Sequence, residues 1–240
     1  MARKVLSSAL VIVFGAALML TTTQCKQSME QSAGWSKDSI ATGDLLFQDI
    51  DCGPLCEAIE RVTQSINGVH FSHVGVAQWM NDSLFVLEAS QGSVHYTPYE
   101  KFLQRSLDSL GKPKVAVARL DSTQQKLLVA SLQHAQVFLG KPYDDFFLPD
   151  NDRYYCSELI YALLEMEDST QQVFYLEPMT YKDPQTGEIF PVWADYFKQM
   201  NMQVPEGLPG LNPGGMSRMA HLRFLHWYWQ PEEWNNNPQE

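Results

Sequence analysis

The chain has 240 residues, with 28 acidic and 17 basic side chains and a formal charge of -11 at pH 7. That balance argues against a nucleic acid as the main partner, because phosphate backbones are bound by an excess of Lys and Arg. It selects no particular substrate, since an acidic surface usually serves solubility alone. The part that follows the first two dozen residues is long enough for one well-packed domain and short for two.

The amino end has the layout of a secretory signal. Arg3 and Lys4 precede an uncharged, mostly apolar run over residues 5–20, which is short for a bilayer span. We therefore expect residues 1–24 to be a signal peptide, residues 25–42 to be a polar tether, and the protein to be exported to the periplasm or cell envelope. Cleavage before Cys25 would fit a bacterial lipoprotein, so a lipid anchor on Cys25 and a free amino end both stay open. Membrane attachment is expected only through that anchor.

The first half of the domain, which we place at 43–240, is rich in strand signals. An apolar segment at 43–48 follows a turn and predicts a strand, and apolar residues at helical spacing predict a helix over 55–66. Two further strand-like segments, at 71–77 and 84–89, flank turn residues typical of a hairpin.

The second half predicts a strand at 115–120, an amphipathic helix at 124–139 ended by Gly140, and a helix begun near Cys156 and capped by Asn151 or Asp152. Beyond Pro178 the chain is rich in proline, glycine and aromatic residues. We expect a long excursion there, with one short helix at 193–200. Its last tryptophans, at 227, 229 and 234, should pack onto the domain, because so many aromatic side chains would otherwise stay in water.

Cys52 and Cys56 are separated by three residues, and three interpretations of the pair remain. In an exported protein they can close a small disulfide. They can also stay as free thiols, or take part in a metal or redox site, although the chain has no second pair to complete a zinc centre.

Cys156 is the most informative residue, because it stands where a helix is expected to begin. Backbone N–H groups at a helix N-terminus and the positive end of the helix dipole stabilise a thiolate, which makes a cysteine nucleophilic near neutral pH. His73 and Glu88 lie in the two hairpin strands and supply the base and the acid that such chemistry needs. A buried, unreactive cysteine is the commoner situation for a lone thiol.

The hairpin gives this hypothesis a geometric test. If Asn81 and Asp82 form a two-residue turn, His73 pairs with Ser90, and Glu88 lies on the same face one diagonal step away, at about 7–8 Å. A carboxylate there can orient the imidazole and stabilise its protonated form. A register slip of one residue would move Glu88 to the opposite face.

The chain resembles the NlpC/P60 superfamily of papain-like cysteine peptidases and amidases through several short words. They are Gly-Asp-Leu-Leu-Phe at 43–47, Ser-His-Val-Gly-Val at 72–76, Leu-Glu-Ala at 87–89, Gly-Lys-Pro-Tyr-Asp at 140–144 and Tyr-Cys-Ser-Glu-Leu at 155–159. The cysteine word comes first in the common arrangement and last here. The order is therefore similar to the circularly permuted, YiiX-like branch, in which Glu takes the third polar position.

The resemblance implies an α+β, papain-like fold with an antiparallel sheet packed against the helix that carries the nucleophile. It implies Cys156 as nucleophile, His73 as general base and acid, Glu88 as the orienting group, and Tyr155 and Asp144 as substrate-binding residues. No cofactor or metal is expected. Nothing in the family's pattern accounts for residues 178–240, so we expect specificity or a lid to reside there.

Three classes of function remain at this point. The first is an exported thiol hydrolase of peptide-like amides, with peptidoglycan stem peptides as candidate substrates. The second is acyl hydrolysis or transfer on lipids, because related permuted papain-like folds resemble lecithin:retinol acyltransferases. The third is a binding module that keeps the fold without catalysis.

Overall fold

The computed structural model describes residues 34–90, 92–170 and 172–231, and a compact unit begins at Trp35. The expected signal peptide, Cys25 and Trp234 lie outside the described residues. Within the part that is described, no helix is both long and apolar enough to cross a membrane.

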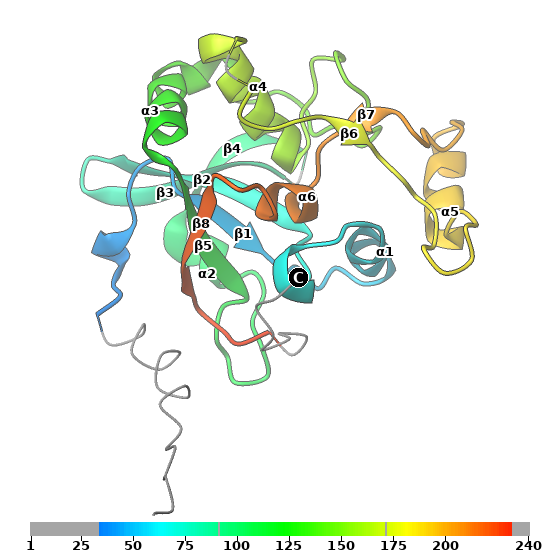
Figure 1. Cartoon of the computed structure of the whole chain (residues 1–240), viewed down its shortest axis with the longest axis horizontal. Helices are drawn as coiled ribbons and strands as arrows, with labels where there is room; N and C mark the ends of the chain where they lie inside the picture. Colours follow the sequence, from blue (N-terminus) through cyan, green and yellow to red (C-terminus); the bar gives the residue numbers. More distant parts are fainter. Residues whose placement is uncertain (1–33, 91, 171, 232–240) are drawn as a thin grey trace, which may run out of the picture. The chain divides into compact units, whose positions relative to one another are not determined.

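Six antiparallel strands form the central sheet, in the spatial order β4-β3-β2-β1-β5-β8 (Figure 1). They are β1 (Leu45–Gln48), β2 (His73–Met80), β3 (Ser83–Ser90), β4 (Ser93–Pro98), β5 (Val115–Leu120) and β8 (Leu222–Trp227), and a separate pair joins β6 (Glu177–Pro178) to β7 (Pro209–Gly210). Every residue of β1 is buried, as its short apolar run predicts for a strand inside the sheet. An antiparallel sheet packed with helices confirms the α+β class.

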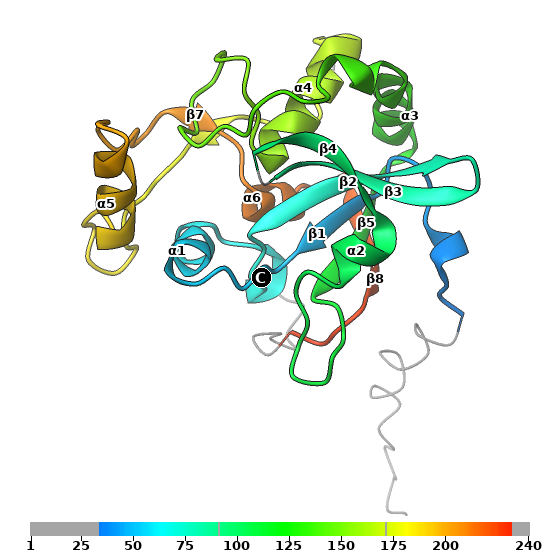
Figure 2. The same ribbon diagram turned by 180° about the vertical axis from the view of Figure 1, so that it is seen from behind.

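Helices cover both faces of the sheet. They are α1 (Pro54–Val62), α2 (Tyr99–Leu103), α3 (Ser122–Ser131), α4 (Cys156–Asp168), α5 (Pro191–Gln199) and α6 (Pro213–Ser217), with short 3-10 turns at Lys37–Ser39, Ile66–Gly68 and Leu132–Val137. On one face Leu159, Ile160 and Leu163 of α4 pack with the apolar side chains of β1, β2 and β5. On the other, Phe102 of α2 lies in a smaller core, and Figure 2 shows α2 on that side.

The hairpin of β2 and β3 has the expected two-residue turn. Met80 pairs with Ser83, and the two turn residues, Asn81 and Asp82, have φ angles of 46° and 62°. Such positive angles are what a tight hairpin turn requires, and Asn and Asp tolerate them better than most residues. The predicted register is therefore confirmed.

The last part of the expected tether, residues 35–42, belongs to the compact unit and packs on the domain. Ile40 is only 2% exposed and joins the smaller core. Its carbonyl accepts a hydrogen bond of 2.8 Å from the indole of Trp79, and the Ala41 N–H donates to the Asp44 carboxylate at 2.8 Å. An apolar side chain that reaches the sheet thus overrides the polar composition around it.

Two predicted helices end earlier than expected. The first stops at Val62 instead of residue 66, and the second stops at Ser131 and continues only as a 3-10 turn to Val137. The predicted cap of the cysteine helix is also wrong, because the N-cap residue is Tyr155. Asn151 instead donates from its side chain to Asp144 at 2.9 Å, within the preceding loop.

Cys52 and Cys56 form a disulfide, which settles the three interpretations of this pair. The bridge joins the segment after β1 to the first turn of α1. It therefore anchors the helix whose last residues reach the cavity described below.

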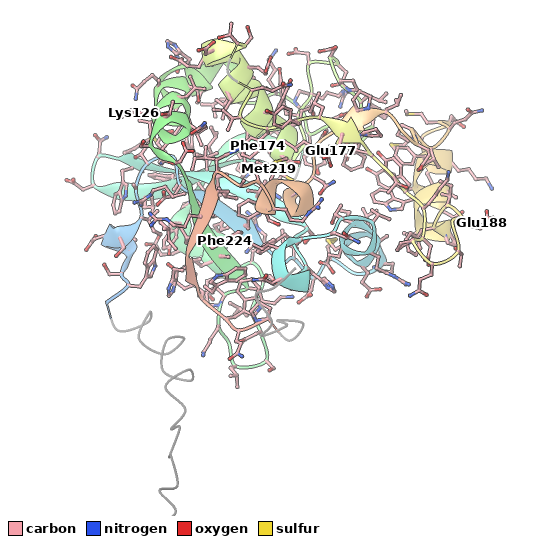
Figure 3. The ribbon with its side chains drawn as sticks, in the orientation of Figure 1. Lys126, Phe174, Glu177, Glu188, Met219 and Phe224 are labelled. Carbon is pink, nitrogen blue, oxygen red and sulfur yellow. A yellow bond between two sulfur atoms is a disulfide. The ribbon has the colours of Figure 1, made fainter. Side chains whose placement is uncertain are left out.

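The chain beyond residue 178 contains more regular structure than its composition predicts. It holds α5, α6 and β7, and it ends in β8, which pairs with β5 at the edge of the main sheet. The ring of Phe224, which Figure 3 labels on β8, lies 5.5 Å from that of Phe47 and 6.0 Å from that of Phe71. Trp229 is 6% exposed, so the expected packing of the last aromatic residues is confirmed there.

Candidate active site

Cys156 is the first residue of α4, as the sequence predicts. Its backbone N–H has no partner within the helix, because the first turn of any α-helix leaves such donors free. The Glu158 carboxylate accepts the N–H of Tyr155 at 3.2 Å, which fixes the chain as it enters the helix. Burial raises the pKa of Glu158 to about 8, so this neighbour is mostly uncharged at neutral pH and does not oppose a thiolate.

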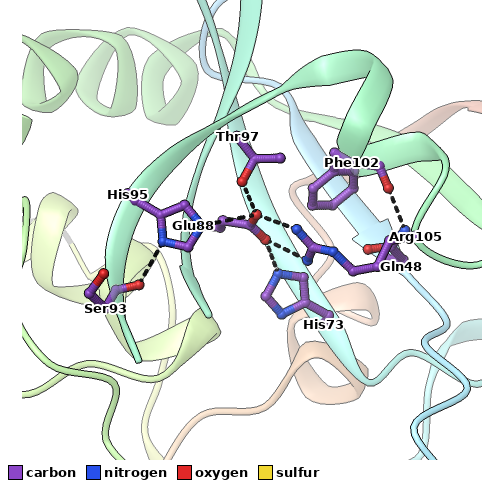
Figure 4. Close-up of polar contacts among 8 residues, drawn as sticks. All are labelled: Gln48, His73, Glu88, Ser93, His95, Thr97, Phe102 and Arg105. Carbon is purple, nitrogen blue, oxygen red and sulfur yellow. Dashed lines mark hydrogen bonds and ion pairs between the residues drawn. The ribbon is translucent and has the colours of Figure 1, made fainter. Parts of the chain in front are cut away.

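His73 and Glu88 meet as the hairpin register predicts. The Nε2 atom of His73 lies 2.5 Å from Oε2 of Glu88, and both side chains are buried (Figure 4). Gly75, on the same strand as His73, lets β2 and β3 pack closely. A Cβ at this position would lie 2.4 Å from a methyl group of Val86 on β3. With Glu88 on Nε2, the Nδ1 atom is the ring nitrogen left to exchange a proton with a thiol.

Glu88 is held by a clamp of further polar groups, which we call the Glu88 clamp: Arg105, Thr97 and His95. Arg105 donates from both terminal nitrogens, at 2.8 and 2.5 Å, and the Thr97 hydroxyl donates to Oε1 (Figure 4). His95 approaches the same oxygen at 3.8 Å. Burial alone would raise the pKa of Glu88, but the hydrogen bonds from Arg105 and His73 lower it well below its usual range. Glu88 is therefore an anion throughout the neutral pH range.

His73 is more basic than an ordinary histidine. Burial would lower its pKa, but hydrogen bonding to the Cys156 thiol and to Glu88, together with their charges, raises it to about 9. The imidazole therefore stays protonated through the neutral range when the thiol is ionised. An imidazolium next to a thiolate is the resting pair that cysteine hydrolases use.

This basicity predicts an unusual pH profile for the alkylation of Cys156. Since the imidazolium persists up to about pH 9, Cys156 should react with an electrophile well below the pH that an ordinary thiol needs. We expect the iodoacetamide reaction at pH 6 to be at least about tenfold faster than in His73→Ala, whose rate should rise only near pH 8.5. Mass spectrometry of labelled Cys156 measures both rates, and superimposable profiles would contradict the pairing.

Cys156 lines a cavity of about 500 Å³. One wall comes from the end of α1, and another comes from the chain beyond residue 176, including Tyr181 and Trp193. The aromatic residues of that wall pack on α1 and α5 as a separate apolar cluster. The expectation that this last part of the chain bears on specificity therefore has a physical basis, because it forms much of the cavity.

Tyr155 and Asp144, the two residues expected to bind substrate, have different surroundings. Tyr155 lines the cavity, and its hydroxyl accepts the N–H of Leu211 at 3.2 Å. Asp144 is fully buried and is not among the residues that line the cavity. Its carboxylate accepts the N–H groups of Phe146 and Leu148 at 3.1 and 2.8 Å, so it organises the loop before Cys156.

Sequence reasoning missed two parts of the site. Tyr143 lines the cavity, and burial and the Cys156 charge raise its pKa well above the usual value, so its hydroxyl remains a donor. It belongs to the word at 140–144, which was a sufficient signal. Arg105 and Thr97 belong to none of the family words. Thr97 lies on β4 and Arg105 lies just after α2, and neither element was predicted from the sequence.

Comparisons with known proteins agree with this architecture. The model of the family described as permuted papain-like amidase enzyme, YaeF/YiiX, C92 family matches residues 39–226. The uncharacterized protein YiiX of Escherichia coli strain K12 is 34% identical over 127 residues, which are 52% of this chain and 57% of that protein. The chain thus matches little more than half the length of this relative.

A solved structure supports the fold. The crystal structure described as metalloprotein yiiX from Escherichia coli O157:H7 superimposes with a TM-score of 0.62 at 23% identity, over 79% of this chain and 98% of that one. At 23% identity this similarity supports the fold alone.

Proposed function

The chain belongs to the permuted papain-like amidase family, YaeF/YiiX, and from this premise we propose that it is a thiol-dependent hydrolase of amide bonds. Cys156 is the nucleophile, His73 the general base and acid, and Glu88 the residue that orients His73. The observation that carries the proposal is that the buried His73–Glu88 pair, joined at 2.5 Å, meets Cys156 at the first turn of α4 and beside a cavity. Together the Cys156 thiol and Glu88 raise the pKa of His73 to about 9.

The reaction follows from these positions. In the resting pair His73 already holds the thiol proton, and the sulfur attacks the amide carbon to form a C–S bond. As the C–N bond breaks, the imidazolium gives its proton to the leaving amine, which leaves a thioester. His73 then takes a proton from water, whose oxygen attacks the thioester, and the C–S bond breaks as the sulfur recovers a proton.

We propose two donors for the oxyanion that forms at each attack. One is the backbone N–H of Cys156 at the helix start, and the second is the hydroxyl of Tyr143. Donors of this kind contribute on the order of 3 kcal/mol each to transition-state binding.

We propose peptide-like amides of the cell wall as the substrates and an exported protein as their hydrolase. Support comes from the signal-like pattern at residues 1–24 and from the Cys52–Cys56 disulfide, since disulfides persist in oxidising compartments. Lipid acyl hydrolysis is the second candidate, favoured by the aromatic wall that Tyr181 and Trp193 give the cavity.

The word metalloprotein describes the neighbouring solved structure, and the described residues of this chain give no support for applying it here. Among the described residues, no group of three or more His, Cys, Asp or Glu side chains is placed to hold a metal ion. The proposed steps therefore use only the side chains named above.

The full chain should release amine-containing fragments from soluble peptidoglycan peptides, detected by mass spectrometry as pairs of masses that sum to the substrate plus water. Fatty acid release from phosphatidylglycerol vesicles, with no peptide cleavage, would favour the second candidate. Turnover of neither substrate would count against both.

A further inference from the structure

We propose that Arg218 recognises an anionic group of the substrate, a carboxylate or a phosphate, and that the cavity of Cys156 therefore selects negatively charged substrates. The inference rests on the proposed function and specifies the substrate class of the same site. It is carried by the charges that line the cavity, by the attachment of Arg218 to the cysteine helix, and by the geometry of a guanidinium.

Arg218 is the cation of the cavity that is left without an acidic partner. Three cations line the cavity: Arg61, Lys182 and Arg218. Arg61 pairs with Asp183 at 3.6 Å, and Lys182 pairs with Glu206 at 3.6 Å. Among residues 34–90, 92–170 and 172–231, the side chain of Arg218 makes neither an ion pair nor a hydrogen bond, and it is exposed.

The backbone around Arg218 is tied to the segment that carries Cys156. Arg218 directly follows α6, and the residue two positions before that helix, Leu211, bonds both neighbours of the cysteine. Its N–H donates to the Tyr155 hydroxyl at 3.2 Å, and its carbonyl accepts from the Ser157 hydroxyl at 2.7 Å. The backbone at Arg218 is therefore fixed relative to the sulfur, and only the Arg218 side chain is free to move.

The other side of α6 is fixed as well. The Ser217 hydroxyl accepts the N–H of Ile66 at 2.9 Å, and a Cβ on Gly214 would lie 2.9 Å from the carbonyl oxygen of Gln64. Gln64 itself lines the cavity. Such close packing leaves little freedom for the helix, so the backbone of Arg218 is held in place and only its side chain has to become ordered when a ligand binds.

One acid without an ion pair, Glu177 on β6, also lines the cavity (Figure 3). It lies beyond ion-pair distance of Arg218, so it does not neutralise that guanidinium. An anion bound in the cavity should therefore lie toward Arg218 and away from Glu177. A guanidinium offers parallel donors that fit a carboxylate or a phosphate, and its charge also raises the local concentration of anions.

Two alkylating reagents that differ in charge test the proposal without a known substrate. Iodoacetate is an anion, iodoacetamide is neutral, and both label the Cys156 sulfur. We expect Arg218→Gln to lower the ratio of their rates, iodoacetate over iodoacetamide, by about threefold to tenfold. Glu177→Gln should leave the ratio unchanged or raise it.

Arg223→Gln is the matched control, because Arg223 is an exposed arginine of β8 that does not line the cavity. A ratio that falls equally in Arg218→Gln and Arg223→Gln, or in neither, would overturn the inference. Slow labelling of the wild type by both reagents would instead count against the proposed function. A failure of the inference and a failure of the proposed function are therefore distinguishable. Circular dichroism of each variant verifies that it is folded.

The same variants separate the two sources of the anion. With a peptide substrate, amidation of the free carboxylate should raise KM in the wild type and not in Arg218→Gln. With lipid vesicles, phosphatidylglycerol should be preferred to neutral diacylglycerol only when Arg218 is present. If the wild type turns over these substrates without distinguishing free from amidated peptide or phosphatidylglycerol from diacylglycerol, Arg218 does not recognise the anionic group.

Discussion

Replacing Cys156 with alanine should lower kcat by at least about four orders of magnitude, the largest effect expected of any single change. The reason is that the remaining groups, His73 and the oxyanion donors, can only assist direct attack by water. The variant should fold, because Cys156 is small and only its sulfur is lost from the core. Turnover of a peptide or ester substrate, followed by mass spectrometry or fluorescence, measures the loss.

Cys156→Ser is the matched control, since it keeps the size of the side chain and a transferable proton. We expect it to be nearly as inactive as alanine, because a hydroxyl is far harder to deprotonate than a thiol. Retention of wild-type turnover by either variant would exclude the thiol mechanism. It would leave the fold and its family membership untouched.

Replacing Arg105 with methionine should lower the free energy of unfolding by about 3–5 kcal/mol. Glu88 has no exposed surface, and without Arg105 its charge keeps only Thr97 and His73 as close partners. Part of the loss also comes from the contact of the Arg105 guanidinium with the ring of Phe102, 5.1 Å away. Urea unfolding at pH 7, with comparison of midpoints and slopes, measures the change.

The double variant Arg105→Met with Glu88→Gln tests the cause of that loss. If an uncompensated buried charge is responsible, removing the charge should recover a large part of the stability. Arg223→Met, which removes an exposed arginine, should change the stability by less than about 0.5 kcal/mol. A similar loss in both single variants would show that the Glu88 clamp has no special role.

The parts of the site that depend on local rules were predictable. Side chains alternate along strands, and Asn81 and Asp82 fix a turn of even length, so the meeting of His73 and Glu88 followed from the sequence of one hairpin. The start of a helix near Cys156 was predicted as well, although its cap was not. Each of these inferences spans fewer than about twenty residues, within which the chain has little choice.

The parts that depend on distant packing were not predictable. Arg105 reaches Glu88 only because β4 pairs with β3 and α2 then packs on one face of the sheet, and no motif precedes Arg105. The strand β8 pairs with β5 across about a hundred intervening residues, and its aromatic composition alone did not indicate a strand. The cap at Tyr155 was hidden because Asn151, a better capping residue, is engaged by Asp144.

The bonds from Leu211 to Tyr155 and Ser157 impose an order on biosynthesis. A ribosome releases the strands that carry His73 and Glu88 first, the nucleophile next, and the segment that buttresses it more than fifty residues later. Domains acquire structure from the amino end as they are made. The polypeptide should therefore hold an exposed, unaligned thiol until its last quarter has emerged, and the site would be complete only when that segment has folded.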